Sequence, residues 1–171
     1  MGRHGKHLDF RFAPREEAGD SAGPHLHLVV HLARAGWIRW RAPAAGQTQQ
    51  RRSRPGKGPL AARLILQEGS SADITEAGTK KNLALWLVRD PQQVPSVASL
   101  GPDPLDENFT AEDLSRILQR AGRAQIKGVL RNQSLLAGIG KAYSDEILHA
   151  ARISPYQAAE RTELRHAEAT R

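Results

Sequence analysis

Residues 125–155 read QIKGVLRNQSLLAGIGKAYSDEILHAARISP, and this stretch decides the expected fold of the second half of the chain. Apolar residues recur at helical spacing on both sides of the Gly-Ile-Gly turn at 138–140. We therefore predict one helix over 124–133 and another that begins near Lys141 and ends before Pro155. Helix, turn and helix at this spacing present backbone N–H groups at a helix N-terminus to an anion.

A further helix is predicted upstream of this stretch. Thr110 and Asp113 can form a capping box at its start, and Gly122 can end it. Residues three or four apart lie on one side of a helix, so this helix and the one from Lys141 should each bury one face. The expected buried residues are Leu114, Ile117, Leu118 and Ala121 in the helix after Thr110, and Tyr143, Ile147, Leu148 and Ala151 in the helix from Lys141.

The first half of the chain alternates apolar and polar residues in the way that is typical of β-strands. The proline- and glycine-rich segment 42–59 predicts a surface loop, and 94–104 predicts a linker. The expected fold class is α+β: a partial antiparallel β-sandwich over 1–96, followed by a helical domain over 97–171. Strands are predicted over 8–12, 26–32, 37–41, 60–66 and 83–88.

The composition narrows the classes of function. The chain has no cysteine, which excludes disulfides and thiolate zinc sites, and no apolar run of the roughly 18 residues that a membrane helix needs. The N-terminus lacks the apolar stretch of a signal peptide, so a cytoplasmic protein is expected. Lys and Arg number 25 against 18 Asp and Glu, and residues 1–98 hold 15 basic against 8 acidic side chains. This surplus favours an anionic partner such as nucleic acid.

Several segments resemble the formamidopyrimidine-DNA glycosylase/endonuclease VIII family. Residues 125–155 closely resemble its helix-two-turns-helix motif, including LAGIG, YSDEIL and the closing ISP. LGPDPLDENFT resembles its linker into the helical domain, and GRHGKHLDF, LHLVVHLARAG and TEAGTKKNLALWLVRDP resemble its β-sandwich strands and loops. The resemblance implies double-stranded DNA with damaged or abasic sites as the partner, and a monomer without membrane attachment.

The resemblance also bears on catalysis. In the family an N-terminal proline amine attacks the sugar carbon to form a Schiff base, and an adjacent glutamate handles protons. Here Met1-Gly2-Arg3 leads directly into the GKHLDF strand, so no catalytic residue is assigned. The family's four-cysteine zinc finger has no counterpart, so no metal and no cofactor are expected. The expectation is a chain truncated at both ends relative to the family.

The resemblance assigns site residues by position. Lys6 matches a strand lysine that reaches the phosphate at the lesion, and Glu146 matches a buried structural glutamate. Lys141 occupies the position of a phosphate-binding asparagine in the turn. Lys80 and Lys81 occupy the position of an arginine–phenylalanine wedge, and a solvated loop pair is the alternative there. The expected DNA-binding residues are Lys6, Lys80, Lys81, Lys127, Gly138, Gly140 and Lys141.

Three functional hypotheses follow from these assignments. The first is a damaged-DNA-binding protein that is non-catalytic as written, and the second is an active DNA glycosylase/AP lyase whose true start lies upstream. The third is residual lyase activity from the amine of Met1 or of Lys6, because free amines form Schiff bases with abasic aldehydes. A metal site on His25, His27 and His31 is disfavoured, because no acidic or cysteine partner is close.

Overall fold

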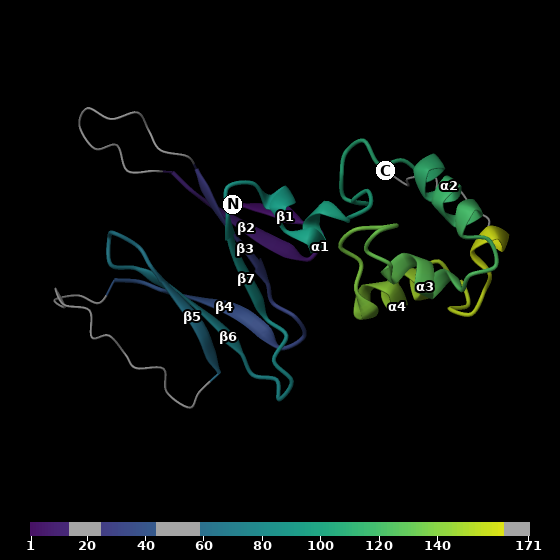
Figure 1. Cartoon of the computed structure of the whole chain (residues 1–171). Coiled ribbons are helices and arrows are strands. Elements are labelled where there is room, and N and C mark those ends of the chain that lie inside the picture. Colours follow the sequence, from purple (N-terminus) through teal and green to yellow (C-terminus); the bar gives the residue numbers. More distant parts are fainter. Residues whose placement is uncertain (14–24, 44–58, 163–171) are drawn as a thin grey trace, which may run out of the picture.

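The computed structural model describes residues 1–13, 25–43 and 59–162, which form a β-lobe and a helical lobe (Figure 1). The β-lobe comes first in the sequence and consists of two antiparallel sheets, and the helical lobe follows it. The predicted α+β class is therefore confirmed. Most of the surface loop predicted at 42–59 lies outside the described residues.

Antiparallel pairing builds both sheets of the β-lobe. The strands are β1 (Gly2–His4), β2 (His7–Phe12), β3 (Leu26–His31), β4 (Gly36–Arg41), β5 (Leu60–Ile65), β6 (Ser71–Glu76) and β7 (Ala84–Val88). The first sheet has the order β1-β2-β3-β7, and the second has the order β4-β6-β5. The two sheets enclose an apolar core, because alternate side chains of a strand point to the same face. Leu28, Val30 and Ile74 are the buried centre of this core.

Short helices occupy the start of the predicted linker. They are η1 (Pro91–Gln93) and α1 (Pro95–Ala98). Val97 of α1 and the neighbouring Val94 pack on Val29, which points away from the space between the sheets. Leu100 packs against the same cluster. The segment up to Leu100 therefore belongs to the β-lobe, and the predicted linker begins too early.

Strand β6 was not expected from the sequence, because its buried residues include two acidic ones, Asp73 and Glu76. Asp73 lies between arginines of the two neighbouring strands and is only 2% exposed. Nε of Arg41 lies 2.7 Å from its Oδ2 atom, and Nη2 of Arg63 lies 2.9 Å from the same oxygen. These partners satisfy the carboxylate, so a charged residue can occupy the central strand of the sheet.

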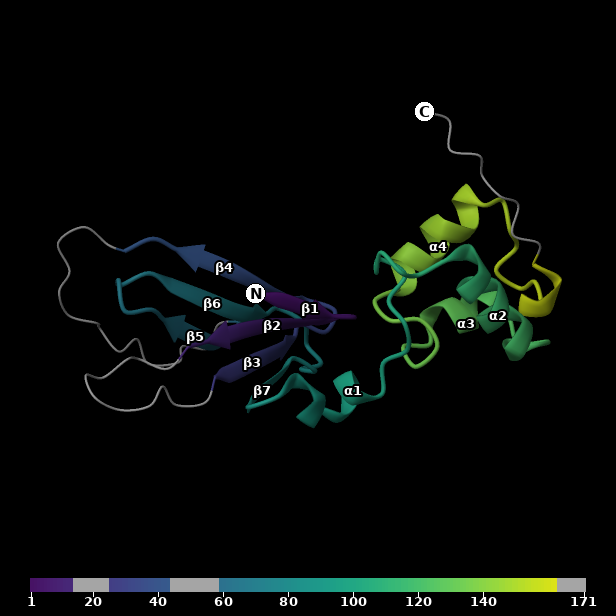
Figure 2. The same cartoon turned by 90° about the horizontal axis from the view of Figure 1, so that it is seen from above.

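The helical lobe contains α2 (Ala111–Ala121), α3 (Ile126–Arg131), α4 (Lys141–Ala150) and the short η2 (Ala159–Arg161). Figure 2 shows α2, α3 and α4 gathered beside the two sheets. The predicted helices are confirmed, and the predicted capping box at Thr110 and Asp113 forms at the start of α2. No helix in the described part of the chain is long and apolar enough to cross a membrane. The buried core is Leu118, Ile126, Val129, Leu130, Leu136, Leu148 and Ala159.

The predicted buried face of α4 is only partly correct. Leu148 is 3% exposed, as expected, but Tyr143 is 72% exposed and Ile147 is 41% exposed. Helical spacing places these residues on one apolar stripe of α4, but α3 covers only part of this stripe. The outer part of the α4 stripe therefore lies at the surface of the described residues.

Leu148→Ala should lower the free energy of unfolding by about 2–5 kcal/mol, because it leaves a cavity in the helical core. The matched change of the preceding residue, Ile147→Ala, should cost about 1 kcal/mol or less, since that side chain is already partly in water. The midpoints of urea unfolding of both variants, converted to free energies of unfolding with one common m-value, measure the difference. Equal losses would place Ile147 in the core and contradict the structure.

Asp73 should make the β-lobe sensitive to acid. The hydrogen bond from Arg63, and then that from Arg41, lower its pKa from 3.8 to about 2 against the effect of burial. The folded state therefore favours the ionised carboxylate, and this contribution to stability is lost as the pH falls from about 4 to about 2. Asp73→Asn should be less stable at neutral pH but lose less further stability over that interval. If the urea midpoints of the unchanged protein and of Asp73→Asn decreased in parallel as the pH falls, the result would contradict this role of Asp73.

Candidate nucleic-acid interface

The two lobes meet at a pair of glycine turns. Gly5, between β1 and β2, has a φ of +53°, and Gly138, before α4, has a φ of +89°. A Cβ atom on Gly5 would lie 3.3 Å from the backbone nitrogen of Gly138, and one on Gly138 would lie 3.3 Å from Nη1 of Arg3. The backbone conformation and the close approach both favour glycine at these positions.

Arg3 connects the lobes across this contact. Its Nη1 atom lies 2.7 Å from Oδ2 of Asp103 and donates a hydrogen bond of 2.9 Å to the carbonyl oxygen of Gly5. The segment that carries Asp103 is itself tied to the helical lobe, because the amide of Ala137 donates to the carbonyl oxygen of Pro102 at 2.9 Å. The turn between β1 and β2 is thereby held beside the turn at 138–140.

Gln133 holds the 138–140 turn in shape. Its Nε2 atom donates to the carbonyl oxygens of Ile139 at 2.9 Å and of Arg131 at 3.0 Å, while its Oε1 atom accepts the N–H of Gly138 at 3.0 Å. Gln133 was not among the predicted site residues, although its place at the end of the predicted helix over 124–133, just before the glycine turn, was a signal. Because the N–H of Gly138 is used internally, anion contacts fall to the residues that follow it.

The N-terminus of α4 opens from this turn. Gly140 is the N-cap residue, no side chain caps it, and no acidic residue lies in the first turn of the helix. The first N–H groups of a helix have no partner within the helix and form the positive end of its dipole. The predicted role of the Gly138–Gly140 region as an anion cradle therefore rests on the start of α4.

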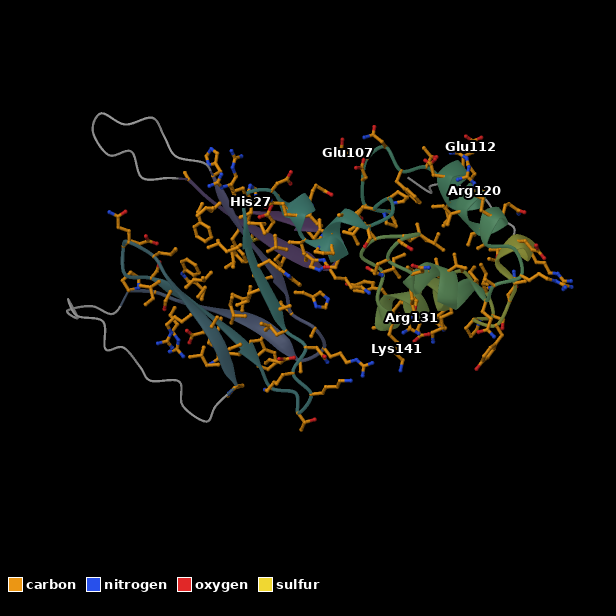
Figure 3. The ribbon with its side chains drawn as sticks, viewed as in Figure 1. His27, Glu107, Glu112, Arg120, Arg131 and Lys141 are labelled. Carbon is orange, nitrogen blue, oxygen red and sulfur yellow. The ribbon has the colours of Figure 1, made fainter. Side chains whose placement is uncertain are left out.

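Three basic side chains surround this helix start. A Cβ atom on Gly140 would lie 3.8 Å from Nζ of Lys6, which comes from the β-lobe. Burial and the nearby charge of Arg131 lower the pKa of Lys6. Figure 3 shows Arg131 and Lys141 on the same edge of the helical lobe. We call Lys6, Arg131, Lys141 and the start of α4 the basic junction; none of its three cations is ion-paired with a described residue.

The other expected DNA-binding lysines lie apart from the basic junction. Nζ of Lys127 lies 2.5 Å from Oδ1 of Asp145, so this lysine is engaged in an ion pair on the helical lobe. Lys80 and Lys81 are exposed in the loop between β6 and β7, and Nζ of Lys81 donates to the carbonyl oxygen of Glu76. The structure thus brings only part of the predicted set together.

The expectation of a buried Glu146 is wrong. Its side chain is exposed on α4, because it points away from α3 and the core. The buried glutamate of the described residues is Glu76, which is 4% exposed. One carboxylate oxygen of Glu76 accepts the backbone N–H groups of Asn82 at 2.8 Å and Leu83 at 3.1 Å. Glu76 therefore shapes the loop that carries the two lysines before Asn82.

The histidines of β3 do have an acidic neighbour, contrary to the sequence analysis. Nδ1 of His27 lies 2.9 Å from Oδ1 of Asp9, which faces it from β2. The ring of His31 lies instead against that of His7, with centroids 4.9 Å apart. Burial, and then the charge of Lys6, lower the pKa of His31. No three potential ligands converge as a metal site within residues 1–13, 25–43 and 59–162.

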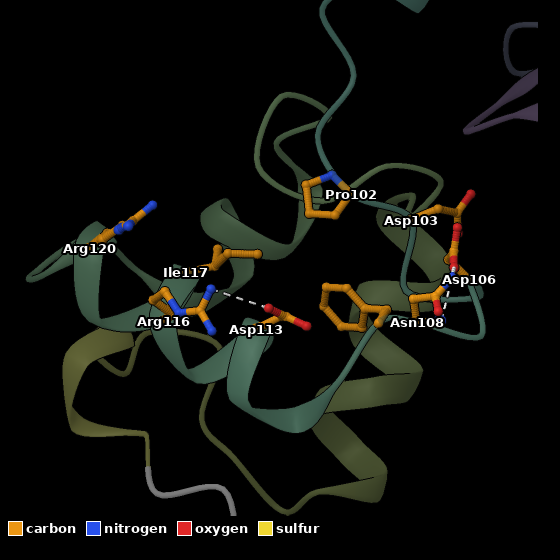
Figure 4. Close-up of a pocket in the computed structure, with 9 residues that line it drawn as sticks. Pro102, Asp103, Asp106, Asn108, Asp113, Arg116, Ile117 and Arg120 are labelled. Carbon is orange, nitrogen blue, oxygen red and sulfur yellow. Dashed lines mark hydrogen bonds and ion pairs between the residues drawn. The ribbon is translucent and has the colours of Figure 1, made fainter.

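A hollow of about 460 Å³ lies between α2 and the loop that precedes it (Figure 4). Phe109, Ile117 and Pro102 form its apolar part. Arg116 lies 3.3 Å from Asp113 on the same helix, and further carboxylates line the other side. Because three carboxylates line this hollow against two arginines, it does not favour a phosphate as the basic junction does.

Known proteins share both the fold and the motif. Residues 100–170 match the family described as the formamidopyrimidine-DNA glycosylase H2TH domain. Formamidopyrimidine-DNA glycosylase of Desulfitobacterium hafniense is 46% identical over 92 residues, which are 53% of this chain and 33% of that protein. The enzyme of the same name from Symbiobacterium thermophilum is 33% identical over 156 residues, 90% of this chain and 43% of that protein.

A solved structure extends the comparison to the whole fold. The MutM (Fpg) protein of Thermus thermophilus superposes with a TM-score of 0.67 and 28% identity, over 95% of this chain and 51% of that one. Residues 100–170 carry the H2TH domain of formamidopyrimidine-DNA glycosylases, and the chain is similar to those proteins over both lobes. It spans between about a third and a half of the length of the relatives named here. The family resemblance proposed from the motif is therefore confirmed for both lobes.

Gln133→Ala should loosen the 138–140 turn and lower the free energy of unfolding by about 1 kcal/mol or more, because it leaves two partly buried backbone groups of the turn, the N–H of Gly138 and the carbonyl of Ile139, without their partner. Hydrogen exchange of the Gly138 amide should become faster. Gln119→Ala is the control, since Gln119 donates one hydrogen bond elsewhere on the helical lobe. Unchanged protection of the Gly138 amide would show that Gln133 does not hold the turn.

Proposed function

We propose that this protein binds duplex DNA through the basic junction and takes part in base-excision repair. The observation that carries the proposal is the approach of Lys6, on the β-lobe, to Gly140 at the start of α4 on the helical lobe. A single phosphate group placed there could contact a lysine and helical N–H groups at the same time.

The electrostatics of the junction favour a polyanion. Lys6, Arg131 and Lys141 repel one another, and the repulsion between Lys6 and Arg131 is one cause of the lowered pKa of Lys6. A duplex presents a regular row of phosphates, so it can neutralise several of these groups together. Contacts to phosphates fix the position of a protein on DNA but do not read its sequence. Binding at the junction should therefore depend on salt more than on base sequence.

The names of the relatives support the repair role. The similar proteins from Desulfitobacterium hafniense and Symbiobacterium thermophilum are named formamidopyrimidine-DNA glycosylases. Duplexes with damaged or abasic sites are therefore the proposed targets, with one protein chain on each duplex. Lys80 and Lys81 extend from the β-lobe and are proposed as additional contacts to the same duplex.

Lys6→Ala should weaken duplex binding to a similar degree for different sequences. Its loss removes about one phosphate contact, so the slope of log affinity against log salt should fall by about 0.9. Arg123→Ala is the control, since Arg123 is exposed in the turn after α2 and outside the basic junction. Fluorescence anisotropy with a labelled duplex at several salt concentrations measures both variants. An equal change for both would assign the effect to net charge alone.

Lys141→Asn should act with opposite signs on stability and on binding. In the free protein, Lys141 opposes the positive end of the α4 dipole, so the change should raise stability by roughly 0.3–1 kcal/mol. On DNA the lysine makes a charge-assisted contact, so the change should reduce the salt slope by about one unit. Thermal unfolding and the salt titration measure the two effects. If affinity and salt slope both stay constant, the start of α4 does not contact DNA.

A further inference from the structure

The outer face of the sheet β4-β6-β5 is basic and aromatic. Trp37, Arg39 and Arg41 alternate along β4, so their side chains point to the same side, away from the core between the sheets. Arg63 of β5 lies on that side too, because Arg39 and Arg63 both pair in register with Asp73 of β6. We call these four residues the outer sheet face. They line a shallow hollow of about 320 Å³.

The charge of this face is positive and its geometry is fixed. Three arginines stand against the one carboxylate of Asp73, which is buried beneath them. Arg63 binds Asp73 through Nε and Nη2, and Arg41 does so through Nε alone. Each guanidinium group keeps N–H donors that these bonds do not use. Asp73 thus holds two guanidinium groups in place at the surface while Arg39 has no ion pair with a described residue.

Trp37 adds an exposed aromatic ring at one end of the row. It is 54% exposed, although a large aromatic side chain usually lies in the interior. The two-residue repeat of a strand is roughly 6.6–6.8 Å, which is about the step between nucleotides of an extended single strand. Aromatic rings stack on bases only where these are unpaired, because the faces of paired bases are already stacked within a duplex.

We propose that the outer sheet face binds single-stranded nucleic acid, with an unpaired base stacked on Trp37 and the backbone phosphates on Arg39, Arg41 and Arg63. Charge complementarity and the aromatic ring select this occupant over an apolar protein surface. The site is separate from the basic junction: in both Figures 1 and 2, β5 lies far from α3 and α4. A duplex on the junction and a single strand on the sheet therefore bind independently.

The test is fluorescence anisotropy of a labelled oligothymidylate on the order of ten nucleotides, with the whole chain. Trp37→Ala should weaken binding at least about fivefold, and Trp37→Phe should retain most of it because a ring remains. Arg39→Gln should lower the salt slope by about 0.7. An oligouridylate of equal length should bind alike, since stacking reads the face of the base and not the sugar.

Trp40→Ala is the matched control. Trp40 lies on the same strand and is 60% exposed, but its side chain points to the opposite face of the sheet. This variant should bind the oligothymidylate within about twofold of the unchanged protein, and Trp37→Ala should bind duplex DNA as before. Thermal unfolding of both variants shows whether each is folded at the temperature of the assay.

Three outcomes would overturn the proposal. The first is unchanged oligothymidylate affinity in Trp37→Ala and Arg39→Gln. The second is an equal loss in Trp37→Ala and Trp40→Ala, which would mean that tryptophan contacts are not confined to this face. The third is displacement of the oligothymidylate by unlabelled duplex, because a shared site would place the single strand on the basic junction. The first two results do not depend on whether duplex binding at the junction itself is found.

Discussion

The packing of the Gly5 turn against the Gly138 turn is the contact on which the basic junction depends. Both glycines adopt positive φ, and neither has room for a Cβ atom without moving a neighbour. Arg3 bridges the same point by pairing with Asp103. A side chain at either glycine would be strained at positive φ and would crowd this contact, on which the position of Lys6 beside the start of α4 depends. The backbone conformation of the two glycine turns therefore positions the charged residues of the basic junction.

Bringing cations together at this contact has an energetic consequence. Partial burial and the charge of Arg131 disfavour the protonated form of Lys6, as its lowered pKa shows. A phosphate group at the same place would reverse this effect, because it favours the protonated amine. The positive end of α4 adds to the same field. The repulsion and partial burial that destabilise the charged form of Lys6 in the isolated protein are therefore offset when an anion binds.

The sequence predicted the elements whose burial depends on local apolar patterns, and it failed where burial depends on distant partners. Strand β6 was not predicted because the burial of Asp73 depends on Arg63 and Arg41, which lie 10 and 32 residues away in the sequence. Periodicity placed Tyr143 on the stripe of α4 but could not say whether anything covers it. For the site, the glycine turn was predicted from the helix-two-turns-helix motif and Lys6 from the resemblance of the first strands, whereas Gln133 acts through hydrogen bonds that only the folded turn reveals.

The most direct test of a junction shared by both lobes is a map of backbone amide shifts in an isotope-labelled sample titrated with a short duplex. We predict that the largest changes fall together on Lys6, on Arg131 and on residues 139–142, at one common duplex concentration, and that they are lost at high salt. Changes confined to the hollow beside α2, or changes at 139–142 without any at Lys6, would contradict the claim that both lobes contact the same phosphates.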